Sequence, residues 1–173
     1  ASTLAADAAT GELVDWAAYH ALRLCADTLA RTVKARILPS SSTVQGDQDK
    51  DKFVDGIEVL IVDDPDAPDP AAPQMTWVHW VLYNIPPQVA GLAEAIAPAQ
   101  LPAGTLEGIN DWKRTGYGGP CPPIGVHRYF HKLYALDTIL PDLNQPTKAQ
   151  LEQAMQGHII GDVELIGRYQ RNQ

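Results

Sequence analysis

The sequence predicts a mainly-β domain built as an antiparallel sandwich. Residues 76–85 and 126–135 alternate in polarity with a period of two, which is the repeat of a strand. Residues 57–62 form a short apolar run rich in β-branched side chains. Prolines and glycines separate these segments, as is typical of strands joined by turns. A chain of 173 residues with 45% hydrophobic residues is long enough for one domain with a sizeable core.

The first segment, residues 11–38, is expected to form an amphipathic helix. Its apolar residues recur at spacings of three and four, as on one face of a helix: Leu13, Trp16, Leu22, Cys25, Leu29 and Val33. Pro39 would end the helix. Residues 40–52 are polar and charged without a repeat, so they predict a surface loop.

The apolar run at 57–62 predicts a strand buried on both faces and ending at Asp63. The next segment, 63–73, is rich in prolines, which remove amide donors and fix φ. It therefore predicts a rigid loop that carries Asp64 and Asp66. Aspartates beside proline also commonly cap turns, and that simpler role stays open for both residues.

Residues 76–85 are apolar on both faces, which favours a central strand over an edge strand. The alternation places Trp77 and His79 on one face of that strand. Pro86 and Pro87 end it. An aromatic residue such as Trp77 is more commonly part of a core than a platform for a ligand.

Residues 104–137 divide into a loop and a strand. Six glycines and three prolines up to position 125 forbid a helix and supply tight turns. A long loop made rigid by proline is more often a binding loop than a spacer. From Val126 onward the alternation places His127, Tyr129 and His131 on one face of a strand. The loop therefore places His127 at an edge of the fold. There it either contacts a ligand or is a structural histidine whose ring nitrogens are hydrogen-bonded within the protein.

The last part of the chain predicts one short helix and a closing strand. Thr147 and Gln150 form a capping box, and Gly157 follows as the stop signal. Residues 158–169 return to a strand pattern.

Composition excludes some functions. A net charge of −8 and a pI near 4.9 argue against a nucleic-acid surface. No apolar run approaches the roughly 20 residues that span a bilayer, so we do not expect an integral membrane protein. The N-terminus lacks the pattern of a signal peptide, which favours a soluble cytoplasmic protein. Because the sequence begins with Ala1, a periplasmic or secreted mature protein is the alternative.

Three motifs resemble signatures of the phosphatidylethanolamine-binding protein family. They are DDPDAP at 63–68, WVHW at 77–80, and GYGGPCPPIGVHRY at 116–129 followed by LYALD. Their order and spacing are also similar to those of the bacterial, Raf-kinase-inhibitor-like branch. The resemblance implies two antiparallel sheets with Greek-key connections and a few peripheral helices. Residues 1–56 lack the family's N-terminal pattern, so we expect them to be a divergent part of one domain over 1–173.

By position, the resemblance implies a pocket for a small anion such as a phosphate, a phosphorylated head group or a carboxylate. The ligand-binding residues that it implies are Asp64, Asp66, Trp77, His79, Gly119, Pro120, His127 and Tyr129. Histidine N–H groups and the amides of a glycine-rich turn can donate hydrogen bonds to such a ligand. Aspartates behind the rings would orient them and favour the charged imidazolium. We therefore expect a binding protein with no cofactor and no catalytic activity.

Other functions stay open at this point. Two histidines and a carboxylate can hold iron or zinc, although their spacing builds no local metal face. Cys121 lies six residues before His127 and could act as a nucleophile, but no third triad member is evident. A metal-dependent or Cys-based hydrolase is thus the alternative function. The resemblance also implies regulation or inhibition of a kinase or protease, and a homodimer.

Overall fold

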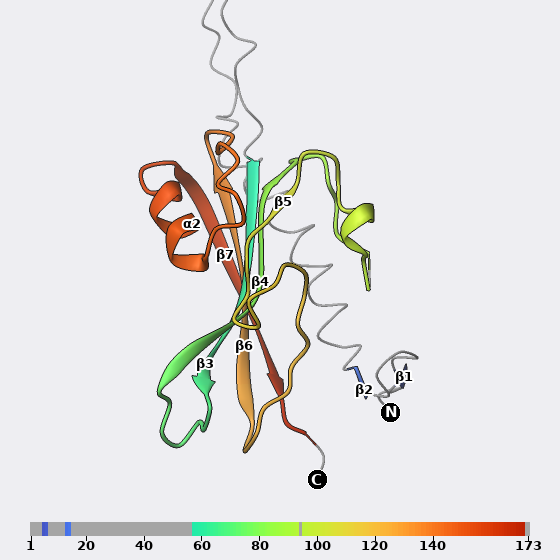
Figure 1. Cartoon of the computed structure of the whole chain (residues 1–173), viewed down its shortest axis with the longest axis vertical. Helices are drawn as coiled ribbons and strands as arrows, with labels where there is room; N and C mark the ends of the chain where they lie inside the picture. The colour runs from blue at the N-terminus through green and yellow to red at the C-terminus, as the bar shows by residue number, and fades with distance from the viewer. Residues whose placement is uncertain (1–4, 7–12, 15–56, 94, 172–173) are drawn as a thin grey trace, which may run out of the picture.

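The computed structural model describes residues 5–6, 13–14, 57–93 and 95–171 (Figure 1). Its strands are β1 (Ala5–Ala6), β2 (Leu13–Val14), β3 (Ile57–Ala67), β4 (Met75–Ile85), β5 (Leu106–Glu107), β6 (His127–Leu136) and β7 (Ile159–Tyr169). Its helical elements are the 3-10 helix η2 (Pro98–Gln100) and the α-helix α2 (Lys148–Met155). The predicted helix over 11–38 lies outside the described residues except for Leu13 and Val14, which form β2. The predicted surface loop at 40–52 lies wholly outside them.

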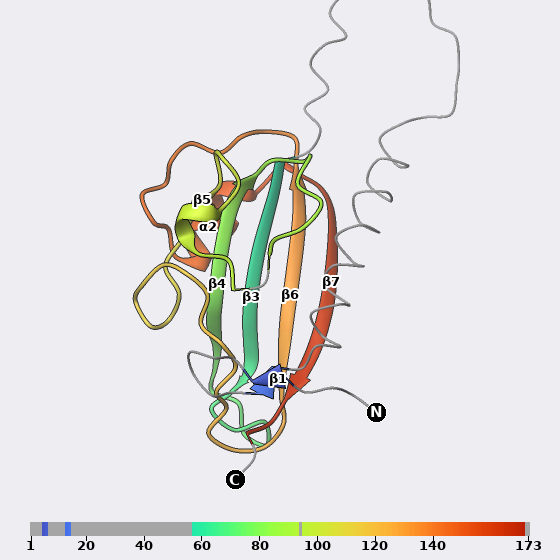
Figure 2. The same cartoon turned by 90° about the vertical axis from the view of Figure 1, so that its right-hand side faces the viewer.

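Five strands form one antiparallel sheet in the order β5-β4-β3-β6-β7 (Figure 2). The chain runs from β3 through β4 to β5 and then returns, by the long loop 108–126, to lie beside β3 as β6. This arrangement is a Greek key. The prediction of a mainly-β, antiparallel fold with a Greek-key connection is confirmed. In the part of the chain that the structure describes, the only strand pair outside this sheet is β1 with β2.

Strand β3 is longer than the sequence predicted. It continues through Asp63 to Ala67, so the expectation that the strand ends at Asp63 and becomes a loop is wrong. The pairing of β3 with β4 shifts register between Asp64 and Ala67, which places Pro65 where the ladder is irregular. A proline at such an irregularity removes no ladder hydrogen bond, so the strand can continue past it. Pairing with β6 reaches only as far as Asp63.

Helix α2 covers one face of the sheet, and this contact forms the core. Leu151 and Met155 of the helix are buried against Val59, Val81 and Tyr83 of β3 and β4. Full burial of each such side chain contributes about 1.5–3 kcal/mol. The predicted capping box is confirmed, because Gln150 N donates to Thr147 Oγ1 while Thr147 N donates to Gln150 Oε1. The predicted central position of β4 and the closing strand β7 are also confirmed.

A buried carboxylate fastens α2 to the sheet. Asp63 is fully buried, and its Oδ2 accepts hydrogen bonds from Lys132 Nζ at 2.9 Å and Lys148 Nζ at 2.5 Å. Lys132 belongs to β6 and Lys148 is the first residue of α2. This single carboxylate of β3 therefore links α2 to both β3 and β6.

Replacing Glu58 by Gln is expected to stabilise the protein at pH 8 and to have little effect at pH 4.5. Glu58 lies in β3 between β4 and β6, and burial raises its pKa from 4.5 to about 7. Above pH 7 the folded protein must hold a buried carboxylate, whereas the unfolded chain ionises freely near pH 4.5. At about 1.4 kcal/mol per pKa unit, the gain in the free energy of unfolding is up to about 3 kcal/mol at pH 8. Urea unfolding at both pH values measures it, and equal gains at the two would contradict the burial argument.

Candidate functional site

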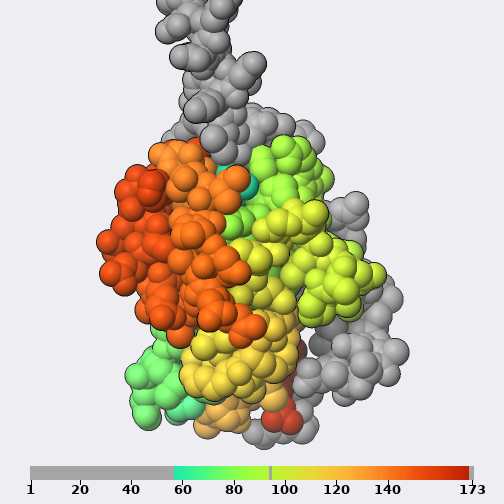
Figure 3. All heavy atoms as spheres, turned by 45° about the horizontal axis from the view of Figure 1, so that its top comes forward, coloured from blue at the N-terminus to red at the C-terminus, as the bar shows by residue number. Residues whose placement is uncertain are grey.

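The predicted site residues come together on the face of the sheet opposite α2. Asp64 lies near the end of β3, His79 in β4, and His127 and Tyr129 at the start of β6. Because β3 pairs with both β4 and β6, the side chains from three strands meet there. Loop 108–126, yellow in Figure 3, passes over this end of the sheet and lies against the orange segment that leads into α2, where Ile109 N donates to Pro146 O at 2.9 Å.

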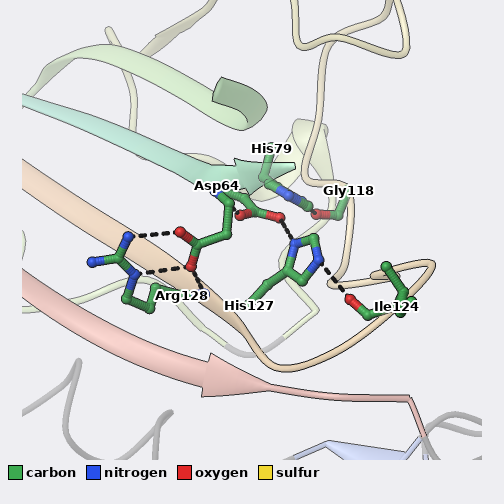
Figure 4. Close-up of polar contacts among 7 residues, drawn as sticks. Asp64, His79, Gly118, Ile124, His127 and Arg128 are labelled. Atoms are coloured by element: carbon green, nitrogen blue, oxygen red, sulfur yellow. Dashed lines mark hydrogen bonds and ion pairs between the residues drawn. The ribbon is translucent and has the colours of Figure 1, made fainter. Parts of the chain in front are cut away.

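His127 is fully buried, and both of its ring nitrogens face hydrogen-bond acceptors (Figure 4). Nδ1 lies 2.6 Å from Asp64 Oδ2, and Nε2 lies 3.0 Å from the carbonyl oxygen of Ile124. Since a carboxylate and a carbonyl only accept, both nitrogens must donate, which is the charged imidazolium form. The expected orientation of this ring by Asp64 is confirmed. Its N–H groups are committed to the protein, however, and do not point at a ligand.

His79 differs from His127 in both contacts and charge. Its Nδ1 donates to the carbonyl oxygen of Gly118 at 2.7 Å, and no described residue hydrogen-bonds its Nε2. Burial is the largest influence on its pKa and lowers it, although the Gly118 carbonyl and Asp64 act in the opposite direction. The aspartates therefore act on His79 in the expected direction, but burial outweighs them, so the expected rise of its pKa above the ordinary value is wrong. Its neutral ring carries a lone pair on Nε2.

Aromatic rings surround the two histidines. The Tyr129 ring lies edge-on to His79 at 5.2 Å between centroids and stacks with His127 at 6.5 Å. Trp112 of the loop contacts both His79 and Trp77, at 5.2 and 5.4 Å. Burial raises the pKa of Tyr129, so its hydroxyl stays protonated and able to donate. That hydroxyl has no hydrogen-bond partner among the described residues.

Gly118 fixes the loop over His79. Its amide donates to the backbone oxygen of His79 at 3.1 Å while its carbonyl accepts from the ring. A Cβ at Gly118 would lie 2.2 Å from the Trp112 ring, so only glycine lets Trp112 pack there. Gly119 and Pro120 follow as half-buried residues of the same turn. Sequence reasoning did not identify Trp112, which lies outside the three motifs, or the Ile124 carbonyl, because a backbone oxygen leaves no signal in a residue pattern.

Asp66 does not orient a histidine, contrary to the expectation from sequence. Its carboxylate forms a two-point ion pair with Arg128, with Oδ1 to Nη2 at 2.6 Å and Oδ2 to Nε at 2.9 Å. The hydrogen bond from the guanidinium is the largest influence on the pKa of Asp66 and lowers it. Arg128 also donates its backbone amide to Asp66, so this pair holds β6 beside the end of β3. Asp66 N in turn donates to Asp64 Oδ1 at 2.8 Å.

The described residues provide no site for either alternative function, a metal-dependent or a Cys-based hydrolase. Cys121 is exposed, and His127 could serve it as a base only by leaving Asp64 or Ile124. Among residues 57–93 and 95–171, no three His, Cys, Asp or Glu side chains gather in a way that could hold a metal ion. In the same part of the chain, no helix is long and apolar enough to cross a membrane.

A pocket of about 360 Å³ lies elsewhere, between β4, the start of loop 108–126 and α2. Its charged lining residues are Asp111, Lys113, Lys148 and Glu152, and none of the predicted site residues borders it. The hollow and the histidine cluster are thus different places. We locate the candidate site at the histidines because the residues of the three motifs meet there and His79 Nε2 has no hydrogen-bond partner among the described residues.

Comparisons with known proteins agree with the motifs. A family model described as phosphatidylethanolamine-binding protein matches residues 36–170. The UPF0098 protein of Methanothermobacter thermautotrophicus is 50% identical over 113 residues, which cover 65% of this chain and 72% of that protein. The UPF0098 protein of Pyrococcus abyssi is 42% identical over 146 residues, covering 78% of this chain and 79% of its own.

Two solved structures share the fold. CT736 from Chlamydia trachomatis, a phosphatidylethanolamine-binding protein homolog, superposes with a TM-score of 0.61 and 41% identity, covering 71% of this chain and 78% of that chain. E. coli YbcL, described as a new member of the mammalian PEBP family, gives a TM-score of 0.57 and 29% identity, with 69% and 74% covered.

Proposed function

Because this chain belongs to the phosphatidylethanolamine-binding protein family, we propose that it binds a small anion at His79 and Tyr129 without turning it over. One observation carries the proposal. Among the described residues, His79 Nε2 and the Tyr129 hydroxyl have no hydrogen-bond partner. His79 and Tyr129 are 3% and 4% exposed, and neither atom is among the described fully enclosed atoms without a partner. A phosphate, a phosphorylated head group or a carboxylate could hydrogen-bond to both.

The charges of the cluster support binding of an anion together with a proton. Asp64 and His127 form one ion pair, and Asp66 and Arg128 form another, so these four residues carry no net charge. Neutral His79 presents a lone pair to the ligand, because its single N–H is used by Gly118. This lone pair repels an anion, and protonation of Nε2 replaces the repulsion by a charge-assisted hydrogen bond. Binding of a fully ionised anion is therefore coupled to uptake of a proton by His79.

The affinity for sulfate is expected to rise as the pH falls from 7.5 to 5.5. Sulfate keeps its charge over this range, so a change in affinity reports on the protein alone. In the free protein the pKa of His79 lies below its ordinary value of 6.5, so proton uptake accompanies binding at neutral pH. Linkage then predicts up to about a tenfold gain in affinity per pH unit until the free ring itself is protonated. Titration calorimetry at three pH values measures the slope.

His79→Gln should remove this pH dependence. His158→Gln, at an exposed histidine paired with Asp137, is the matched control and should keep it. His131, whose pKa burial also lowers, is unchanged in both variants, so it cannot produce a difference between them. A flat pH profile in the wild type, or the same slope in His79→Gln, would overturn the proposal.

Regulation of a kinase or protease is a second role that we propose for the same region. The side chains beside the histidine cluster are exposed and apolar, which supports a protein partner there: Trp112, Ile124 and Val126. Inhibition assays with purified kinases and proteases test this role, and unchanged enzyme activities would count against it.

A further inference from the structure

Loop 108–126 is anchored to two neighbouring residues of strand β4. At the first anchor, Asp111 N donates to Val78 O at 3.0 Å, and Asp111 Oδ2 accepts from Val78 N at 2.8 Å. At the second anchor, Gly118 N donates to His79 O at 3.1 Å, and the Gly118 carbonyl accepts from the His79 ring at 2.7 Å (Figure 4). Because the two anchors are adjacent on the strand, the chain between Asp111 and Gly118 must fold back on itself.

One side chain, that of Asn110, closes this turn. Its Nδ2 donates to Gly116 O at 2.9 Å, and its Oδ1 accepts from Trp112 N at 3.0 Å and from Arg114 N at 3.4 Å. Its backbone amide donates to Arg114 O at 2.9 Å. The two amides at Oδ1 also fix which end of the side-chain amide is the oxygen. Asn110 is 2% exposed, so water does not readily replace these contacts.

The closed turn determines the surroundings of the His79 ring. Trp112 packs on Gly118, where a Cβ would lie only 2.2 Å from the indole, and it lies edge-on to His79 at 5.2 Å. Trp112 therefore contributes to the burial of His79. The Gly118 carbonyl holds a proton on Nδ1, which leaves Nε2 as the ring nitrogen without a partner among the described residues.

We propose that Asn110 is a positioning residue of the anion site, a role that rests on the function proposed above. By closing the turn, Asn110 keeps the Gly118 carbonyl on Nδ1 of His79 and so presents Nε2 to the ligand. Side chains of a binding site keep their geometry when supporting hydrogen bonds lock them in place. A ring without this carbonyl is free to turn or to exchange its tautomer, and either change removes Nε2 from the ligand.

Opening the turn should also change the charge of His79. Burial is the largest influence on the pKa of this ring, and it lowers that pKa. Titratable groups face the ring from three elements: Asp63 and Asp64 of β3, Asp111 of the loop, and Tyr129 and His131 of β6. A substitution at Asn110 removes none of these groups. Loss of burial therefore raises the pKa of His79 toward its ordinary value.

NMR titration of the imidazole nitrogens, without sulfate, tests the proposal on the full chain. His79→Gln lacks one of the five histidines and so identifies the His79 signals. The wild type should show a neutral ring with its proton on Nδ1 and a titration midpoint below the ordinary value. Asn110→Ala should give a mixture of the two tautomers and a higher midpoint.

Asn110→Ser is a milder variant, which answers the question if the alanine variant does not fold. Its hydroxyl oxygen can accept from the Trp112 amide, but it lacks the amide that reaches Gly116 O. The same changes in tautomer and midpoint are expected, with a smaller loss of stability. Circular dichroism spectra that match the wild type establish that each variant is folded.

Asn84 offers a matched control on the same strand as His79. It is 6% exposed and also holds a loop, since its Nδ2 donates to Leu140 O at 2.8 Å and its Oδ1 accepts from Leu140 N at 3.0 Å. Asn84→Gly removes both bonds and still permits the positive φ of 57° at this position. This variant should lower stability but leave the tautomer and the midpoint of His79 as in the wild type.

Unchanged His79 signals in the Asn110 variants overturn the proposal. Equal changes in Asn84→Gly also overturn it, because any loosening of the fold would then alter the ring. Sulfate titration of the same samples is scored separately. At pH 5, where the charge of the ring differs least between the proteins, Asn110→Ser should bind sulfate about tenfold more weakly, as for one lost hydrogen bond to a charged group. A wild type that binds no sulfate overturns the proposed function, whereas unchanged ring signals overturn only the role of Asn110.

Discussion

Replacing Asp64 by Ala is expected to lower the free energy of unfolding by about 3–5 kcal/mol, the range for removing one partner of a buried ion pair. The side chains of Asp64 and His127 are only 5% and 1% exposed. Without the carboxylate, the imidazolium of His127 would lie buried opposite the Ile124 carbonyl alone. The amide of Asp66 would also lose its acceptor. Urea unfolding at pH 7 measures the loss.

The chain offers a matched control in a second pair of the same chemistry. Asp137 and His158 also form an Asp–His pair, at 2.8 Å, but their side chains are 53% and 45% exposed. Asp137→Ala should cost no more than about 1 kcal/mol, since water replaces the lost contact. Comparable losses in the two variants would mean that burial is not what makes the Asp64 pair important.

Gly108→Ala is expected to destabilise the fold by about 3 kcal/mol or more, at the upper end of the cost of overpacking a core. Gly108 begins loop 108–126, and its amide donates to Val81 O at 2.9 Å. A Cβ there would lie 2.4 Å from the backbone oxygen of Pro146 and 2.6 Å from Val81 Cγ1. Relief requires movement of backbone, because Pro146 O accepts the hydrogen bond of the next residue, Ile109. Thermal and urea unfolding measure the change.

Gly91→Ala is the control for this substitution. A Cβ at Gly91 meets nothing within 4 Å, so the same chemical change should alter the free energy of unfolding by less than about 1 kcal/mol. If Gly108→Ala were as mild as this control, the loop would not be anchored as tightly as its contacts indicate.

Sequence reasoning identified the strands and the residues of the site, because these depend on local patterns. The period of two placed His127 and Tyr129 on one face, and the structure confirms it through the stacking of their rings. Sequence reasoning failed for the end of β3, because whether Pro65 ends the strand depends on where the pairing with β4 becomes irregular. The residues around the proline do not carry that information.

The charge of the site could not be predicted from the sequence either. The pKa of His79 is set mainly by burial, and that burial comes with Gly118 and Trp112, more than 30 residues away along the chain. The partner of Asp66 was easier to predict from the sequence. Arg128 directly follows His127, so the alternation of a strand places it on the opposite face, and there it pairs with Asp66.

The Greek-key return also decides the order in which this protein can fold during synthesis. The β3–β4 hairpin is complete once Ile85 has emerged, but the other neighbour of β3 begins only at His127. At typical elongation rates of about 5–20 residues per second, the apolar edge of β3 stays open on the order of seconds. Such an edge is a template for misassembly until β6 pairs with it. Ribosome-bound chains stalled before β6 should be protease-sensitive at β3, and resistance there would show that the hairpin is protected by other means.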